Sequence, residues 1–380
     1  MAVSGVRQGD LLGMLTNTLP NYPWKGDFFQ TFNFSRYPLL AKFASGRNRV
    51  DGGKTLNWHV SRSGQGNWQW TRPMQEDTTQ ATDTTVEFAA KWCFGQTHWM
   101  MDSRDTDING GDGDPVEKLC STIDDRRGGA FKDAADAIEV AAIGVPENSS
   151  DDLRPYGFLS YIVPGPTGTT TDDGFIGQTL RYNSHTSGSS ATTTTIAGVD
   201  RSSSDNSMLR NWAGKYDKID ASFIKSLRRM HKSVNIRPPV TMVKEGVSIT
   251  NHNYCTYAPL EQVLLIEELL DSKNSNWGLE LDGKSGVPVF QKIPIEYLPS
   301  LDLQSSSDTN YYRAYVKPII TIDHDSFQIN VLRGRWKMES PPIRPDKNHN
   351  AVKVFVDFAY QLACKHPKYA GGILHKALTF

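Results

Sequence analysis

The clearest pattern of hydrophobic and polar positions in this chain runs from Asp114 to Gly144. Apolar residues recur there every three to four positions, which predicts one long amphipathic helix. Asp114 is a suitable N-cap, Pro115 suits the first helical position, and Gly144 is typical of a helix end. The helix would span roughly 43 Å. It carries no set of catalytic residues, so we interpret it as a long structural support, a beam. Gly128-Gly129 is the place where it would kink or break.

In the segment that precedes this helix, apolar and polar residues alternate with a period of two. Leu56, Trp58 and Val60 alternate with polar residues in 55–60, and a second alternating run covers 84–94, which together predict a hairpin. The polar segment between the two runs is too long for a compact domain, so we expect a projecting loop. That loop contains Trp68, Trp70 and Arg72, which we expect to contact another subunit.

Five further elements follow from the same patterns. Two helices are predicted, the first N-capped by Asp220, and three strands are predicted in the last third of the chain. The helices are 221–234 and 260–272, and the strands are 315–322, 327–333 and 351–358. The segment 147–218 is rich in loops and hydroxyl groups, with Tyr156, Phe158, Tyr161 and Trp212 as its expected anchors. The chain therefore mixes helices and strands, an α+β pattern.

The first 50 residues predict an arm rather than a domain. Apolar residues between Asp10 and Leu19 predict a short helix that Pro20 ends, and an irregular aromatic stretch that includes Trp24, Phe28 and Phe29 follows. Such a stretch needs a surface to lie on. It covers either the core of its own chain or a neighbouring subunit, and the sequence leaves both open.

Composition narrows the function. The chain has 380 residues, 38% of them hydrophobic, and a formal net charge of −1, which disfavours direct nucleic-acid binding as the main role. The N-terminus lacks an apolar signal-peptide core and no apolar run is long enough to span a membrane, so we expect neither export nor membrane insertion. The four cysteines are far apart, which favours reduced, buried thiols; they are Cys93, Cys120, Cys255 and Cys364.

Two motifs suggest chemistry, and their contexts argue against both. Asp105 to Gly110 matches the first half of an EF-hand loop, but Val116 occupies the position that needs a bidentate glutamate, so no metal is expected. Residues 278–285 formally match a phosphate-binding loop ending in Lys284-Ser285, but Pro288 leaves no room for the helix that must follow. A β-turn is the better interpretation, and we expect no catalytic residues and no cofactor.

In this order, the elements resemble the major capsid proteins of tailed bacteriophages, with the Hong Kong 97 capsid fold. The similar stretches are VDGGKTLNWHV, the DPVEKLCSTIDD helix, the run from IAGVDRSSS to NIRPPV, and the tail from SFQINV to QLACKH. The resemblance implies an N-terminal arm, an extended E-loop hairpin, a peripheral domain with the spine helix, an axial domain, and late strands that return to the peripheral domain. The corresponding boundaries are 1–50, 51–104, 105–150, 151–310 and 311–380.

The function that the resemblance implies is self-assembly, as hexamers and pentamers, into an icosahedral shell that encloses viral double-stranded DNA. Expected partners are other copies of the chain, a portal protein, and scaffold or cement proteins, and the expected location is the virion after assembly in the host cytoplasm. Lysines are absent from 55–90, so covalent crosslinking through an E-loop lysine is doubtful. Some members of the family carry an N-terminal scaffolding region that is cleaved off. In this chain the predicted arm begins within the first residues, so we expect a separate scaffold protein or none. The alternatives are an encapsulin-type nanocompartment, a phosphate-binding-loop enzyme, and a tail or baseplate component.

Overall fold

The structure is a computed structural model of the whole chain. It describes residues 37–61, 70–74, 83–102, 104, 115–146, 153–162, 176–178, 195–201, 203–235, 243–244, 247–248, 253–271, 288–291, 293–302, 317–345 and 350–376.

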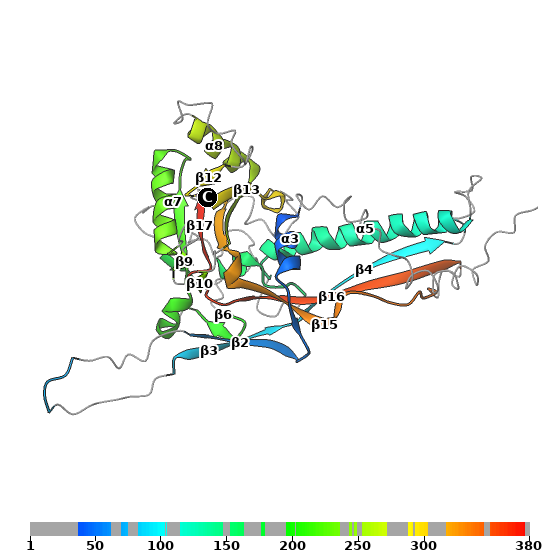
Figure 1. Cartoon of the computed structure of the whole chain (residues 1–380), viewed down its shortest axis with the longest axis horizontal. Coiled ribbons are helices and arrows are strands. Elements are labelled where there is room, and N and C mark those ends of the chain that lie inside the picture. The colour runs from blue at the N-terminus through cyan, green and yellow to red at the C-terminus, as the bar shows by residue number, and fades with distance from the viewer. Residues whose placement is uncertain are drawn as a thin grey trace, which may run out of the picture.

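One elongated part of the molecule combines the long helix with a four-stranded sheet (Figure 1). Helix α5 (Pro115–Ile143) confirms the predicted beam and runs unbroken through Gly128-Gly129. It packs against β4, the edge strand of a sheet in the order β1-β15-β16-β4. These strands are β1 (Asn48–Val50), β15 (Phe327–Glu339), β16 (Ala351–Cys364) and β4 (Cys93–Asp102). The predicted strands 327–333 and 351–358 are therefore confirmed, and each continues for six further residues.

A second sheet, with seven strands, lies beside the C-terminal end of α5 (Figure 1). Its order is β12 (Val289–Phe290), β13 (Ile293–Tyr297), β11 (Tyr254–Ala258), β14 (Ile319–Asp323), β17 (Gly371–Lys376), β8 (Asn211–Tyr216) and β5 (Ile176–Gln178). The segment 311–380, expected to supply late peripheral strands and a C-terminal segment, thus contributes strands to both sheets. Strands β14 and β17 join β8 and β11 of the expected axial segment, because strand partners are chosen by non-local contacts.

Two helices accompany this second sheet, α7 (Ala221–Ser233) and α8 (Leu260–Asp271), and both confirm the predictions. Asp220 caps α7 by accepting hydrogen bonds from the backbone N–H groups of Ser222 (2.8 Å) and Phe223 (3.2 Å). The helix crosses β17 at Gly372, where a Cβ would lie 2.7 Å from Met230. Only glycine permits this close approach of helix and strand.

The hairpin is formed by β2 (Thr55–Ser61) and β3 (Thr85–Lys91), which pair antiparallel from Thr55–Lys91 to Ser61–Thr85. The predicted return strand 84–94 is corrected at Trp92. The chain leaves the hairpin there, and residues 93–102 enter the four-stranded sheet as β4. The buried Trp92 ring holds this corner by donating from Nε1 to the carbonyl of Gly53 at 3.0 Å. Local alternation cannot reveal such a change of partner.

The arm contains a helix that the aromatic pattern did not predict, α3 (Pro38–Ser45), with Pro38 at its first position. The remaining elements are short. They are α6 (Phe158–Tyr161), the 3-10 helices η2 (Ser204–Leu209), η3 (Pro299–Leu301) and η4 (His324–Ser326), and the strand pairs β6 (Thr195–Ile196) with β7 (Val199–Asp200) and β9 (Val243–Lys244) with β10 (Val247–Ser248). The expected helix between Asp10 and Leu19 lies outside the described residues.

The loop-rich segment is anchored in the main core. Phe158 and Tyr161 are fully buried there, as expected, and the Phe158 ring meets that of Phe327 edge to face at 4.7 Å. Arg201 was not predicted as an anchor. It is fully buried and donates to the carbonyls of Leu209 (2.8 Å) and Tyr161 (3.2 Å). Burial lowers the pKa of Arg201 to about 10, so it stays charged at neutral pH.

Candidate assembly surfaces

The base of the β2–β3 hairpin is a rigid platform built from aromatic side chains. Trp58 stacks on Phe88, with the ring centroids 5.2 Å apart, and donates from Nε1 to the carbonyl of Cys364 at 3.1 Å. The backbone N–H of Ala89 also donates to the carbonyl of Ala197 at 2.8 Å. These contacts tie the hairpin to the end of β16 and to the β6–β7 turn, so the direction in which it leaves the body is set by packing. Figure 1 shows it extending away from both sheets.

Beyond this platform, the described part of the loop presents apolar side chains to solvent. Trp70 is 88% exposed, Met74 is fully exposed, and Arg72 between them is also exposed. Trp and Arg are the residue types that contribute most to protein interfaces. The other expected contact residues are Trp68, Trp24, Phe28 and Phe29. They lie outside the described residues, so their expected role stays a prediction.

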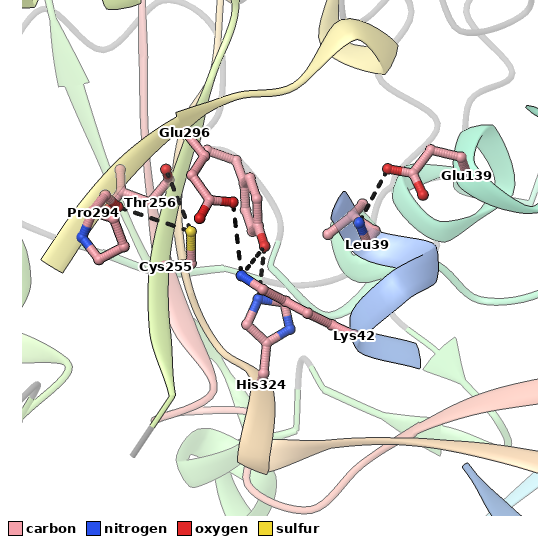
Figure 2. Close-up of polar contacts among 9 residues, drawn as sticks. Leu39, Lys42, Glu139, Cys255, Thr256, Pro294, Glu296 and His324 are labelled. Atoms are coloured by element: carbon pink, nitrogen blue, oxygen red, sulfur yellow. Dashed lines mark hydrogen bonds and ion pairs between the residues drawn. The ribbon is translucent and has the colours of Figure 1, made fainter. Parts of the chain in front are cut away.

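Helix α3 joins the arm to the body through a polar junction that sequence reasoning missed (Figure 2). Lys42 donates from Nζ to the Tyr257 hydroxyl at 2.8 Å, and this hydroxyl lies 2.9 Å from His324 Nε2. Burial lowers the pKa of His324 to about 3, so its imidazole is neutral and accepts the proton of the Tyr257 hydroxyl. Lys42 also lies 3.7 Å from Glu296.

The same junction holds its reactive side chains in unreactive forms. Burial raises the pKa of Tyr257 far above its ordinary value and that of the Cys255 thiol to about 12. The protonated thiol and the protonated phenol are poor nucleophiles at neutral pH, and the Nε2 lone pair of the neutral His324 is engaged by the Tyr257 hydroxyl. The arrangement is suited to hold α3 in place. Cys93, Cys255 and Cys364 are buried and form no disulfide, which confirms the prediction for these three cysteines.

The other end of α3 is held by α5. Glu139 accepts hydrogen bonds from the backbone N–H groups of Leu39 (Oε1, 3.2 Å) and Leu40 (Oε2, 2.8 Å), and the Tyr37 hydroxyl donates to Asp136 at 2.6 Å. Burial raises the pKa of Glu139 to about 7, although both hydrogen bonds act in the opposite direction. Nothing in the local sequence around Leu39 indicates this partner 100 residues away.

The outer face of α8 is a second exposed apolar surface. Leu260, Leu264 and Leu265 are all exposed, whereas Val263 and Ile266 are buried against the sheet. The sequence pattern of 260–272 does not distinguish Leu264 from its buried neighbours, yet its side chain is 54% exposed. The run from Val263 to Ile266 is apolar on all sides of the helix, and a helix lying on a sheet can bury only one of them.

Neither a metal-binding cluster nor a membrane-spanning helix is found among the described residues. In this part of the chain, no three His, Cys, Asp or Glu side chains are grouped so that they could hold a metal ion. No helix of the described ranges combines the length and apolar character needed to cross a membrane. The half EF-hand at 105–110 and the phosphate-loop match at 278–285 lie outside the described residues, so the structure tests neither motif.

Comparison with solved structures identifies the architecture. A chain of the cyanophage A-1(L) capsid asymmetric unit superposes with a TM-score of 0.57 over 91% of this chain and 93% of its own length, at 10% sequence identity. This protein has the fold of a phage capsid protein. This agreement in fold confirms the resemblance found in the sequence.

Two further solved structures are less similar to this chain. A capsid chain of a native GTA particle gives a TM-score of 0.49 at 11% identity, covering 89% of this chain and 90% of that one. The SrpI encapsulin of Synechococcus elongatus gives 0.44 at 11% identity, covering 87% and 84%. These scores do not bear on the choice between a phage shell and an encapsulin. No family model matches the sequence, and neither does any curated protein.

Proposed function

We propose that this protein is the major capsid protein of a tailed bacteriophage, which self-assembles as hexamers and pentamers into an icosahedral shell around packaged double-stranded DNA. The observation that carries the proposal is the capsid fold, which covers more than nine-tenths of both compared chains. A structural role without enzymatic activity agrees with the junction around Tyr257, whose reactive groups are held protonated or neutral.

In this proposal, α5 and the four-stranded sheet form the peripheral part of the subunit, and the seven-stranded sheet with α7 and α8 forms the axial part. The β2–β3 hairpin is the extended loop that covers a neighbour, and residues 1–50 are the arm. A portal protein, and scaffold or cement proteins, would complete the particle. Assembly takes place in the host cytoplasm, and the mature protein resides in the virion.

The formal net charge of −1 fits a shell that contains DNA without binding it tightly. Binding to DNA phosphates would need an excess of basic residues and would depend strongly on salt. We therefore expect purified subunits to bind DNA weakly and without sequence preference.

Subunit contacts are proposed to use the exposed tip of the hairpin. Burying one Trp side chain contributes ~4–6 kcal/mol before ordering costs, and closed symmetry repeats the contact in every subunit. We expect a Trp68→Ala/Trp70→Ala double variant to fold normally and to lose most of its yield of closed shells, measured by sedimentation. Leu153→Ala, at an exposed apolar position outside the hairpin, is the control. Shells of unchanged yield and stability from the double variant would contradict this role of the loop.

The leucine face of α8 is the second proposed contact between copies. Its exposed leucines are spaced like one face of a helix, above a buried inner face. Leu264→Glu places a charge on this face, and we expect soluble subunits that assemble poorly. Glu267→Gln, a conservative change on the same helix, should assemble like the wild type. Normal shells from Leu264→Glu would exclude α8 from the contact.

Electron microscopy of the protein expressed alone, and then with its neighbouring genes, tests the function itself. We expect uniform polyhedral shells in at least one of the two preparations. DNA inside the particles supports a phage capsid, whereas a co-purifying cargo protein supports the encapsulin alternative. Tubes or rings would support the tail-component alternative. Nucleotide binding that is lost in Lys284→Ala would support the enzyme alternative.

A further inference from the structure

The start of α3 is capped by a residue of another helix. Tyr37, at the N-cap position, makes no side-chain cap, and Pro38 has no N–H group to donate. The first backbone N–H groups of the helix, which have no acceptor within α3, are those of Leu39 and Leu40. They donate to the two carboxyl oxygens of Glu139 on α5. Figure 2 shows the Glu139 side chain reaching across to the first turn of α3. The cap therefore exists only while α3 lies against α5.

The cap is also cut off from water. Glu139 is 5% exposed, and among the residues that the structure describes no cation forms an ion pair with it. Several titratable groups lie on the elements around Glu139. The nearest are Tyr37 at the N-cap of α3, Lys42 within α3, and Asp136 one turn earlier on α5. Tyr257 on β11 faces the junction as well, with Glu296 and His324 behind it. An ionised Glu139 is stabilised by two hydrogen bonds and the N-terminal end of α3, and is destabilised by burial.

We propose that Glu139 is a proton-controlled clasp: α3, where the N-terminal arm meets the body, is held more tightly against α5 when the Glu139 carboxyl is protonated than when it is ionised. The reason is desolvation. When α3 detaches, the carboxyl regains water and ionises easily, whereas in the attached state its two hydrogen bonds do not make up for the hydration that its charge has lost. The protonated carboxyl keeps an acceptor oxygen for one of the two N–H groups. This property belongs to the single chain and does not depend on shell assembly.

The pH range follows from linkage. Burial raises the pKa of Glu139 from 4.5 to about 7 in the attached state, so the attached state binds the proton more tightly. Attachment is therefore strongest below pH 4.5, weakens as the pH rises to about 7, and changes little above that. If the carboxyl is fully hydrated after detachment, the detachment equilibrium rises roughly 70-fold between pH 5 and pH 8. Partial hydration gives a smaller change.

Neither His324 nor Tyr257 titrates across this range. The pKa of His324 is lowered to about 3 by burial, and that of Tyr257 is raised far above its ordinary value. Both side chains therefore stay neutral between pH 5 and pH 8. A change in α3 attachment within this range points to Glu139.

Hydrogen exchange of the full chain tests the clasp. Exchange rates of the α3 amides, each divided by the rate of the same unstructured peptide at the same pH, give protection factors between pH 5 and pH 8. We expect protection of α3 to fall about 10- to 70-fold over this range, with most of the fall complete by pH 7. Amides of α7, whose cap is local, serve as the internal reference and should show no such fall.

Two variants separate the clasp from a general loss of packing. Glu139→Gln keeps the shape and an acceptor oxygen but cannot ionise, so its α3 protection should not depend on pH. Tyr37→Phe removes the neighbouring hydrogen bond to Asp136 and should lower protection while keeping the pH dependence. Constant α3 protection in the wild type would overturn the proposal, and this measurement does not require either variant to fold. A pH dependence that survives in Glu139→Gln would also overturn it.

Discussion

Helices α3 and α7 both begin at a carboxylate that accepts two backbone N–H groups, yet the two caps differ in origin and in electrostatics. Asp220 of α7 is local in sequence and exposed, and its hydrogen bonds to Ser222 and Phe223 lower its pKa. Glu139 of α3 comes from another helix and is buried, and burial raises its pKa to about 7. The hydrogen bonds lower the pKa in both cases, and Asp220 also accepts one from the Ser222 hydroxyl. The net shift is upward only at Glu139, because desolvation outweighs hydrogen bonding only where water is excluded.

The largest effect is expected from the apolar anchor of α3 rather than from its cap. Leu39 is completely buried in the main core, so Leu39→Ala should lower the free energy of unfolding of the unassembled subunit by about 2–5 kcal/mol. Denaturant unfolding measures this loss. Leu40→Ala, at the half-buried next position, is the matched control and should have a smaller effect. An equal or smaller loss for Leu39→Ala would mean that the polar contacts dominate the attachment.

A smaller effect, of opposite sign, is expected from Glu139→Gln at pH 8. Because the folded-state pKa is raised, ionisation of Glu139 destabilises the wild type as the pH rises from 4.5 to about 7. The variant avoids this cost, so at pH 8 it should be about 1–3 kcal/mol more stable than the wild type, after an allowance for the buried amide. At pH 5 the advantage should largely disappear. A variant that is less stable than the wild type at both pH values would show that the charge stabilises α3.

The smallest effect is expected at the exposed cap of α7. Asp220→Ala should lower the thermal midpoint at neutral pH, because two N–H groups lose their acceptor. The pKa of Asp220 is lowered, so its contribution is present above the ordinary value of 3.8 and is lost as the pH falls through the folded-state pKa. The difference between variant and wild type should therefore shrink in acid. Asp217→Ala, another exposed aspartate, is the control, and an equal effect there would remove the evidence for a cap.

Sequence reasoning succeeded where the signals are local. The period of α5, the Asp220 cap of α7 and the alternation around Trp58 each lie within one element, and the structure confirms all three. It failed where the deciding contact is distant in the chain. The missed strand β17 begins with two glycines that carry no apolar pattern, and these glycines are needed because Thr321 and Met230 approach too closely for any Cβ.

The candidate surfaces divide in the same way. Trp70 and Arg72 were expected at a contact surface from their place in a long polar loop, and the structure places both in solvent. The junction of Lys42, Tyr257 and His324 had no sequence signal, because its members are separated by 215 and 67 residues. The exposed leucines of α8 were hidden inside an apolar run, since the pattern does not show which side of the helix meets the sheet.

The sequence by itself determined the order and type of the main helices and strands, the projecting hairpin loop, and the resemblance to a capsid fold. These depend on the spacing of side chains along one element, which the backbone geometry of helices and strands sets. Only the tertiary structure decided that β14 and β17 join the seven-stranded sheet, that the chain changes sheets at Trp92, and that Glu139 caps α3. Each of these depends on which distant segments share a desolvated contact, and burial of that contact changes both the partner of a strand and the pKa of a carboxyl group.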